Sequence, residues 1–241
     1  MTEPDFTYVG SELDLFAAAR NWRAYWSSMV RPHLGNRVLE IGAGIGTITR
    51  LLCSPHRSWT AVEPDAHLAQ RIRDWAQESQ TEGVAVVTGS IDDVPGDGTF
   101  DTVIYIDVLE HIEDDRSEVL KAFGRLAPGG RLVVLAPAHP WLYTAFDASI
   151  GHFRRYNRTM MRDLRPDQAT ETLSVYLDSA GIIASAGNRL LLRSATPTRA
   201  QIQLWDRRLV PVSRRLDRVL GYRVGKSLLT VWRKPQGGSE R

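Results

Sequence analysis

The chain has 241 residues, a formal net charge of +2 and an apolar fraction of 43%. Its length and composition allow one α/β domain over residues 1–241 with a full hydrophobic core. The single cysteine, Cys53, excludes an internal disulfide framework, and residues 1–10 lack the basic start and the apolar stretch of a signal peptide. We therefore expect a cytoplasmic protein.

The net charge hides a strong asymmetry along the chain. Residues 61–120 carry 15 acids against 3 arginines, whereas residues 185–241 carry 13 bases against 3 acids. A basic tail of this kind suits an anionic substrate, an anionic membrane or nucleic acid, and it is equally compatible with an ordinary solvated surface.

Apolar side chains recur at helical spacing over residues 11–33 and stop at Gly35, which predicts an N-terminal helical cap over residues 1–34. Short apolar runs then alternate with amphipathic stretches, and the latter predict helices over 66–80 and 115–126. Unbroken Val, Ile and Leu runs are typical of parallel strands covered on both faces. The predicted strands form a core over residues 35–137 and lie at 37–41, 59–63, 84–89, 101–106 and 131–137.

The regular alternation ends after this core. Residues 138–168 are rich in aromatic residues, histidine and arginine and poor in periodicity, as functional loops are. We expect a helix over 169–180, a strand over 182–192 and a final strand over 227–235. Apolar residues at steps of three and four from Ile202 to Val219 predict an amphipathic helix, kinked or divided at Pro211, within an insertion over 195–225. Its other face carries Arg207, Arg208, Arg214, Arg215 and Arg218.

Three glycines, Gly42, Gly44 and Gly46, follow the first predicted strand and precede a helical stretch. Ligands of doubly wound folds bind at such a turn, where glycine lets the backbone approach them closely. The spacing is G-x-G-x-G rather than the G-x-G-x-x-G of a dinucleotide site. Glu40, two residues before the turn, would disfavour a pyrophosphate and favour a cation.

Acidic residues also end the next two predicted strands. Glu63 stands where nucleoside-binding folds place the acceptor for both ribose hydroxyls. Asp92 is placed to accept a hydrogen bond from an exocyclic adenine amine while Ile91 packs on the ring. Together with the glycines, these residues predict a site for a nucleoside whose third part is not phosphate.

These motifs resemble those of the class I S-adenosylmethionine-dependent methyltransferases, over roughly Gly35 to Pro137 and the final strand. The matching segments are "VLEIGAGIGT", "AVEPD", "GSIDDVP", "FDTVIYIDVLEHIEDD" and "LAPGGRLVVLAP". The resemblance implies an α/β fold: a doubly wound, seven-stranded, mostly parallel Rossmann-like sheet whose last strand is antiparallel, with the helical cap and the helical insertion added. It also implies S-adenosylmethionine as cofactor, bound by Glu40, Gly42, Ala43, Gly44, Gly46, Thr47, Glu63, Pro64, Ser90, Ile91, Asp92, Asp107 and Val108.

Methyl transfer from a sulfonium depends mainly on alignment of the acceptor with the methyl carbon. A base is needed only where the acceptor must lose a proton. The histidines at or beyond the carboxyl ends of the fourth and fifth predicted strands are therefore the catalytic candidates: His111, His139 and His152. The other three histidines fall in expected surface turns or helices.

The loop after the fifth strand is the expected acceptor site. Guanidinium groups there can make bidentate contacts to a carboxylate or phosphate, so we expect an acceptor with an anionic group. The candidate substrate-binding residues are Tyr143, Arg154, Arg155 and Tyr156, with Tyr25 of the helical cap as a further wall of the site. Packing and solvation alone would also account for these side chains.

The segment "DVLEH" places Asp107, Glu110 and His111 at a spacing that can converge on one helical face. A similar constellation in the ubiquinone-biosynthesis O-methyltransferases is implicated in binding a divalent ion. We expect no metal here, because most class I enzymes with this local pattern are metal-independent, and a cation at these three residues is the alternative.

The sequence as a whole predicts a small-molecule methyltransferase, acting in O-methylation within bacterial secondary (natural product) or envelope-related biosynthesis. The alternatives are an RNA or protein methyltransferase and a cofactor-binding protein without methyl transfer. An NAD-dependent oxidoreductase is disfavoured by the glycine spacing. We expect no nucleic-acid partner; the basic helix is open between a lid, a dimer face and a membrane-surface contact, and the oligomeric state is equally open.

Overall fold

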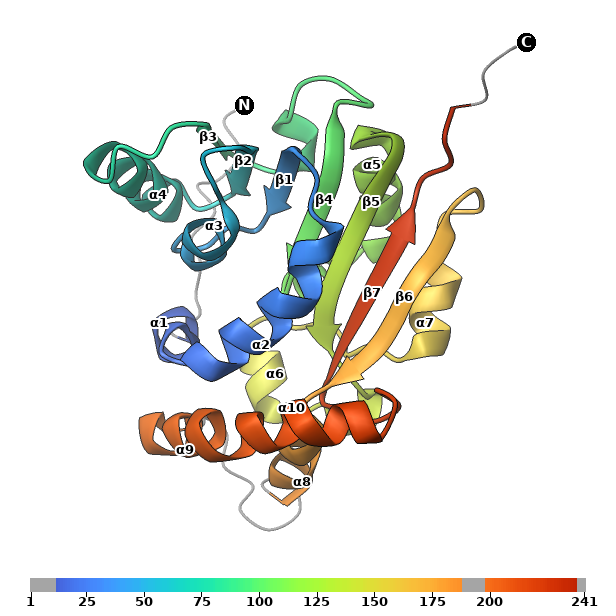
Figure 1. The fold of residues 1–241 in the computed structure, drawn as a ribbon. Helices are drawn as coiled ribbons and strands as arrows, with labels where there is room; N and C mark the ends of the chain where they lie inside the picture. The colour runs from blue at the N-terminus through green and yellow to red at the C-terminus, as the bar shows by residue number, and fades with distance from the viewer. Residues whose placement is uncertain (1–11, 188–197, 238–241) are drawn as a thin grey trace.

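The computed structural model describes residues 12–187 and 198–237, which contain a seven-stranded sheet flanked by helices (Figure 1). The strand order is β3-β2-β1-β4-β5-β7-β6, and β7 runs antiparallel between β5 and β6. This is the doubly wound sheet that the sequence predicts. The strands are β1 (Arg37–Ile41), β2 (Ser58–Glu63), β3 (Val84–Thr88), β4 (Phe100–Ile106), β5 (Leu126–Pro137), β6 (Thr170–Leu177) and β7 (Ser227–Arg233).

Helices lie on both faces of the sheet and around the carboxyl ends of its parallel strands, where α1, α2, α6 and the α9–α10 stretch gather in Figure 1. The predicted cap forms α1 and α2, separated by a short break at Ala18 and Ala19. The helices are α1 (Glu12–Ala17), α2 (Arg20–Val30), α3 (Thr47–Leu52), α4 (Ala66–Glu78), α5 (Asp115–Arg125), α6 (Ala145–Ser149), α7 (Arg158–Leu164), α8 (Ser179–Gly187), α9 (Arg199–Leu204) and α10 (Val210–Val219).

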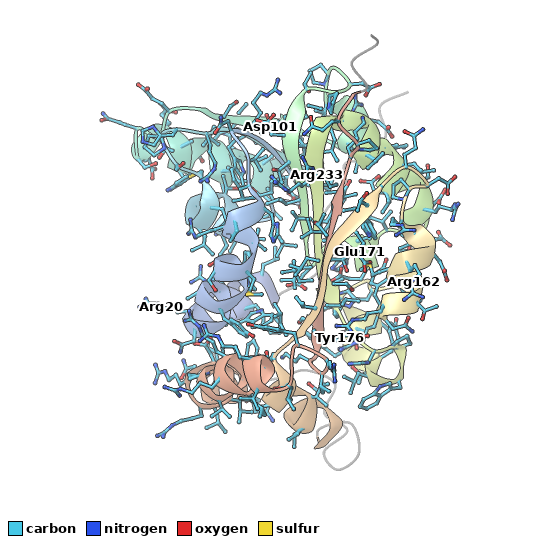
Figure 2. All side chains as sticks on the ribbon, turned by 45° about the vertical axis from the view of Figure 1, so that its right-hand side comes forward. Arg20, Asp101, Arg162, Glu171, Tyr176 and Arg233 are labelled. Carbon is cyan, nitrogen blue, oxygen red and sulfur yellow. The ribbon has the colours of Figure 1, made fainter. Side chains whose placement is uncertain are left out.

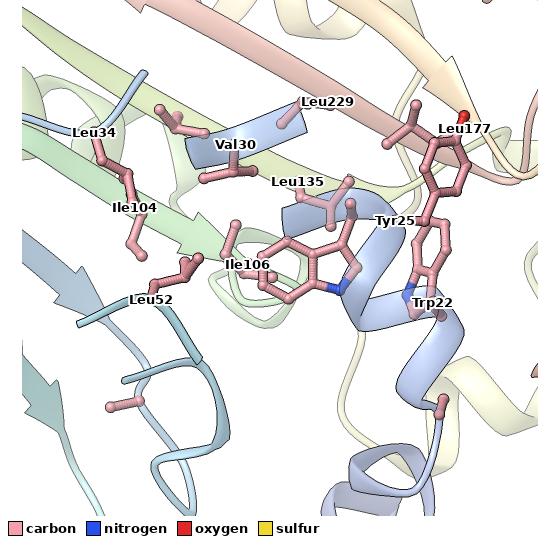
Figure 3. Packing of buried hydrophobic residues seen from close by; sticks show 14 of the residues in the cluster. Trp22, Tyr25, Val30, Leu34, Leu52, Ile104, Ile106, Leu135, Leu177 and Leu229 are labelled. Carbon is pink, nitrogen blue, oxygen red and sulfur yellow. The ribbon is translucent and has the colours of Figure 1, made fainter. Parts of the chain in front are cut away.

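Two hydrophobic cores lie on opposite faces of the sheet because successive strand residues point to opposite sides. Ile104 belongs to the core beneath α2, whereas its neighbour Tyr105 belongs to the core beneath α5. Figure 3 shows the first core, in which Trp22 and Tyr25 of α2 lie near Leu177 of β6. The unbroken apolar strands of the sequence are explained by this two-sided burial.

The predicted helix over 169–180 and strand over 182–192 are wrong. The structure has the edge strand β6 first and helix α8 after it, and residues 188–192 lie outside the described part. An edge strand exposes polar residues, so "TETLSVYL" lacks the apolar run of a central strand. The apolar "SAGIIASAG" of α8 in turn mimics a strand.

The predicted amphipathic helix forms, but its register changes at a π-helical turn over Trp205–Leu209, just before Pro211. The π-helical turn rotates the residues that follow it, those of α10, about the helix axis relative to a continuous α-helix. Val212 and Val219, predicted to be buried, are exposed, whereas Ser213 and Asp217 are buried. The arginines are exposed, as expected.

The buried acid on this helix has a structural task. Asp217 accepts hydrogen bonds from the backbone amides of Asp178 and Ser179, at 2.7 and 2.9 Å, and from the hydroxyl of Tyr25 at 2.7 Å. It thereby satisfies donors at the start of α8 and ties α10 to α2.

Within residues 12–187 and 198–237, no helix is long and apolar enough to cross a bilayer.

Candidate functional site

A cavity of about 280 Å³ opens at the carboxyl edge of the sheet. Three parts of the chain build it: the glycine turn after β1, the end of β4, and the helices and loop that cover this edge. Its wall includes Trp22, Arg23, Trp26, Gly42, Ala43, Gly44, Thr47, Asp107, Glu110, His111, Phe146, Asp147, His152, Arg155, Trp205 and Lys226.

The glycine turn requires backbone that only glycine adopts without strain. Gly42, Gly44 and Gly46 have φ values of 69°, 54° and 75°. A Cβ on Gly42 would also come within 2.6 Å of Val108, which therefore packs directly on the turn. The turn leads into α3 at Thr47 and leaves room on its cavity side.

Two buried carboxylates lie on the strands beside this turn, and one of them, Glu63, is hydrogen-bonded to it. Glu63 accepts hydrogen bonds from the Gly44 amide at 2.7 Å and the Asp65 amide at 3.0 Å. Each carboxylate oxygen has two acceptor sites, so Glu63 retains capacity for a ligand. Glu40 lies in the interior away from the cavity wall, where one of its oxygens accepts from Thr49 and Trp59, both at 2.6 Å.

Burial governs the protonation of Glu40. It raises the pKa of this carboxyl to about 7, although the hydrogen bonds from Thr49 and Trp59 oppose the rise. Burial also raises the pKa of Glu63, against the hydrogen bonds from the Asp65 and Gly44 amides. Glu40 thus joins β1 to α3 and β2 in this structure and is not among the residues of the cavity wall.

The expected adenine residues follow β3 and are not among the cavity-lining residues. Ser90 caps a short 3₁₀ turn over Ile91–Asp93. Ile91 is packed in the core beneath α5, and Asp92 is exposed in an ion pair with Lys121 at 2.5 Å. Pro64, half-buried after β2, lies on the neighbouring strand end. These residues lie at the ends of adjacent strands, along the same edge as the glycine turn.

Asp107 directly follows β4, has a φ of 54° and lines the cavity. Desolvation in the cavity raises the pKa of Asp107, and positive charge on His152, when protonated, on Lys226 and on Arg155 opposes this rise. A carboxylate at the mouth of the glycine turn is suited to an ammonium group of a ligand.

His152 and Asp147 form a hydrogen-bonded pair on the cavity wall. The His152 Nδ1 lies 3.2 Å from Oδ1 of Asp147, a buried carboxylate that also accepts from Nε and Nη2 of Arg155, at 2.8 and 3.0 Å. Burial alone would raise the pKa of Asp147, but the hydrogen bonds from His152, Arg155 and Thr144 hold it well below its usual range. Asp147 is therefore ionised, and His152 donates Nδ1–H to it.

Glu110 lies at the bottom of the same wall and is fully buried. Neither of its oxygens has a hydrogen-bond partner among the described residues, and burial, with Asp107 nearby, holds its pKa well above the usual range. One oxygen lies 3.8 Å from Nε2 of His152, whose ring packs edge-on against His111 with centroids 4.5 Å apart. Burial and the charge of His152 lower the pKa of His111 to about 4.

The residues that could together bind a metal ion here differ from the predicted group of Asp107, Glu110 and His111. One ligand atom each from Glu110, His111 and His152 lie within 4.8 Å of one another, whereas Asp107 is not part of this group. A buried carboxylate with unpaired oxygens and two imidazoles fits a divalent cation. It fits equally a protonated glutamic acid, which is the form that its raised pKa favours.

Several predicted acceptor-site residues do not lie on the cavity wall. His139 is stacked on Tyr176, with centroids 4.9 Å apart, and its Nε2 lies 3.0 Å from the Gly225 carbonyl. Figure 2 labels Tyr176 on β6. Tyr156 is fully buried and donates to Leu109 O and to Asp115.

Three further predicted residues have structural partners. Arg154 pairs with Asp115 at 2.7 Å and donates to the Glu113 carbonyl, the Tyr143 hydroxyl donates to the His152 carbonyl at 2.6 Å, and Tyr25 is bound to Asp217. Of the loop candidates, His152 and Arg155 thus reach the cavity. An aromatic-rich, basic loop packs most of its side chains inward, and its sequence does not distinguish the two that remain.

Sequence reasoning missed three charged residues of the cavity wall: Arg23, Asp147 and Lys226. The Nε of Arg23 is buried with no hydrogen-bond partner among the described residues. The Nζ of Lys226 lies 3.7 Å from the centroid of the Trp205 ring and 3.6 Å from Asp178. Asp147, five residues before His152, was the one detectable from the sequence, as an acid near a candidate base.

Comparisons with known proteins agree with this arrangement. Residues 39–134 match the family model described as "Methyltransferase domain". A demethylmenaquinone methyltransferase of Tropheryma whipplei is 28% identical over 131 residues, 54% of each chain. A ubiquinone biosynthesis O-methyltransferase of Xanthomonas axonopodis is 30% identical over 142 residues, 51% of this chain and 59% of that protein. The chain spans little more than half the length of these curated relatives.

Solved structures share the fold at low sequence identity. The crystal structure of the [4+2]-cyclase SpnF superposes with a TM-score of 0.62 at 17% identity, covering 95% of this chain and 96% of that one. This likeness extends over the sheet and its flanking helices, and it concerns the fold alone.

Proposed function

We propose that this chain is a class I S-adenosylmethionine-dependent methyltransferase, as its similarity to the family model and to the curated relatives supports. In this proposal it transfers the methyl group of S-adenosylmethionine to an oxygen of a small-molecule acceptor in the cavity. One observation carries the proposal: the glycine turn, Asp107 and the His152–Asp147 pair face the same enclosed space.

The residues fit the amino-acid end of this cofactor. The glycine turn leaves space for it, Asp107 offers a carboxylate to its ammonium group, and Arg23 has a buried nitrogen to offer its carboxylate. Glu63, Ile91 and Asp92 would hold the ribose and adenine along the neighbouring strand ends. When bound, the cofactor supplies an electrophilic methyl group on a sulfonium.

His152 would remove the proton of the acceptor hydroxyl. Asp147 fixes the ring with Nδ1–H directed to its carboxylate, which leaves Nε2 as the basic atom. The buried Asp147 also stabilises the charge that the ring acquires. The three tryptophans Trp22, Trp26 and Trp205 exclude water from the acceptor.

Lys226 and Arg155 line the cavity beside their carboxylate partners, Asp178 and Asp147, and their remaining N–H groups can donate to an anionic group of the acceptor. These donors support an acceptor with an anionic group. In this proposal Lys226 takes the substrate-binding role that we had expected of Arg154. The names of the two curated relatives, a demethylmenaquinone methyltransferase and a ubiquinone biosynthesis O-methyltransferase, further direct the search toward quinone-related acceptors.

Transfer of labelled methyl groups to a panel of phenols, quinols and hydroxy acids tests the proposal. We expect a product with at least one anionic phenol or hydroxy acid. Absence of transfer to every acceptor, with cofactor binding intact, would instead favour a cofactor-binding protein whose chemistry is not methylation, a reading supported by the fold shared with a cyclase.

A further inference from the structure

The α9–α10 stretch exposes a surface on which every charged side chain is positive. Residues 198–225 contain two acids, Asp206 and Asp217, and both are buried, at 5% and 0% exposure. Asp206 accepts from the Trp22 amide at 2.9 Å and Asp217 from the start of α8, so both acids face inward. The exposed arginines are Arg199, Arg207, Arg208, Arg214, Arg215, Arg218 and Arg223.

Aliphatic side chains lie beside these arginines instead of in the core. Val212, Leu216 and Val219 recur at steps of four and three, so they form one stripe on the outer side of α10. Val219 is 83% exposed and Val212 49%. Arg215 is three residues after Val212 and four before Val219, so it lies beside this stripe, and Arg218 lies next to Arg215 on the side away from the stripe. The outer surface of α10 is thus itself amphipathic, in addition to the inner surface that packs on α2 and α8.

We propose that the outer face of α9 and α10 docks on the surface of an anionic lipid bilayer. Arginines near such a surface are attracted by the negative lipid headgroups, and the neighbouring aliphatic side chains can enter the boundary between headgroups and acyl chains. The helix would lie in the plane of the interface. Its inner side contributes Trp205 to the cavity wall, so docking brings the cavity close to the bilayer.

The charges of this face disfavour the other partners. A symmetric dimer formed through it would place the same arginines of two copies together without an acid to offset them. Single-stranded RNA is held by exposed aromatic platforms, whereas Trp205 is buried and the exposed apolar residues here are aliphatic.

Cosedimentation with vesicles tests the proposal on the full chain. We expect binding to phosphatidylcholine–phosphatidylglycerol vesicles, weakened by salt, and little binding to phosphatidylcholine alone. The double variant Arg215→Gln/Arg218→Gln should bind about tenfold more weakly, since each arginine contributes to attraction at the surface. Val219→Asp should also weaken binding, because it places a negative charge on the apolar stripe without touching the core.

Arg162→Gln/Arg165→Gln provides the matched control. It removes the same charge from exposed positions at α7, on the other side of the molecule from α9 and α10, where Figure 2 labels Arg162. This control should bind like the wild type. Equal losses in the two double variants, equal binding to both vesicle types, or no binding to either would overturn the proposal.

Sedimentation of the protein alone and binding to single-stranded RNA complete the test. A dimer that dissociates in Arg215→Gln/Arg218→Gln, or RNA binding that this variant loses while vesicle binding persists, would overturn the proposal. A vesicle preference abolished by the variant, with no change in association state, supports it.

Discussion

His152 and Asp147 are joined by a hydrogen bond of 3.2 Å, and this contact sets which ring nitrogen of His152 carries the proton. The ionised Asp147 accepts from Nδ1, so the unprotonated nitrogen of the neutral ring is Nε2. The same carboxylate binds Arg155, which keeps its orientation fixed. In the proposed mechanism, the loop after β5 thus contributes one oriented base to the site.

Replacement of either partner should affect turnover more than binding. His152→Ala should lower kcat by about 10²–10⁴-fold, the usual loss of a general base. Asp147→Asn should also lower kcat, because its amide can donate to Nδ1 and force the proton onto Nε2. A loss of kcat with a changed pH–rate profile and unaltered affinity for S-adenosylhomocysteine is the expected result. A loss explained wholly by lower stability, or by KM, would contradict the assignment.

Lys226 and Arg154 provide a matched pair for the acceptor. Lys226→Met should raise the KM of an anionic acceptor with little change in cofactor affinity, since a lost anchor removes uniform binding. Arg154→Met should leave KM unchanged, because Arg154 is paired with Asp115 away from the cavity. Steady-state kinetics on both variants checks this, with circular dichroism as the control for folding. A larger effect at Arg154 would reverse the assignment.

The buried Glu40 should make stability fall as pH rises. Its pKa is about 7 in the folded chain against 4.5 ordinarily, so the folded state holds the proton more strongly and loses stability between these values. Glu40→Gln should remove a penalty of up to about 3 kcal/mol above pH 7 and change little below pH 4.5. Urea unfolding of both proteins at several pH values measures it. Parallel stability curves would show that Glu40 does not titrate in this range.

Removal of metal ions by chelation distinguishes a protonated Glu110 from a Glu110 that is ionised and coordinates a metal cation. With Glu110 protonated, exhaustive EDTA treatment should leave methyl transfer intact. Activity lost with EDTA and restored by Mg²⁺ or Zn²⁺ would instead assign Glu110, His111 and His152 as ligands, in place of the set with Asp107. His152 would then be unable to serve as the free base.

The sequence predicted the part of the molecule in which local pattern and burial agree. The five parallel strands are buried on both faces, so their apolar runs are visible without the structure, and the turn at Gly42 is set by local backbone geometry. β6 and α8 were exchanged because an edge strand is polar and α8 is uniformly apolar. The local sequence pattern does not show that β6 lies at the edge of the sheet or that α8 is a helix.

The acceptor side of the site depends on contacts between distant segments. Tyr25 and Asp217 are 192 positions apart, and their hydrogen bond removes Tyr25 from the cavity. Lys226 reaches the wall because the insertion before β7 folds back over the sheet edge. Tyr156 and Arg154 were chosen for residue type, and Asp115 on α5 binds both. Such pairings follow from topology and not from spacing.

The most direct measurement is calorimetric titration with S-adenosylhomocysteine and NAD. We expect S-adenosylhomocysteine to bind and NAD not to bind. Glu63→Ala should weaken the binding of S-adenosylhomocysteine by about 1–3 kcal/mol, the usual loss of a hydrogen-bonded charged acceptor. Glu171→Ala, on the distant edge strand β6, should bind like the wild type (Figure 2). Binding of NAD, or unchanged affinity for S-adenosylhomocysteine in Glu63→Ala, would contradict the assignment of this site.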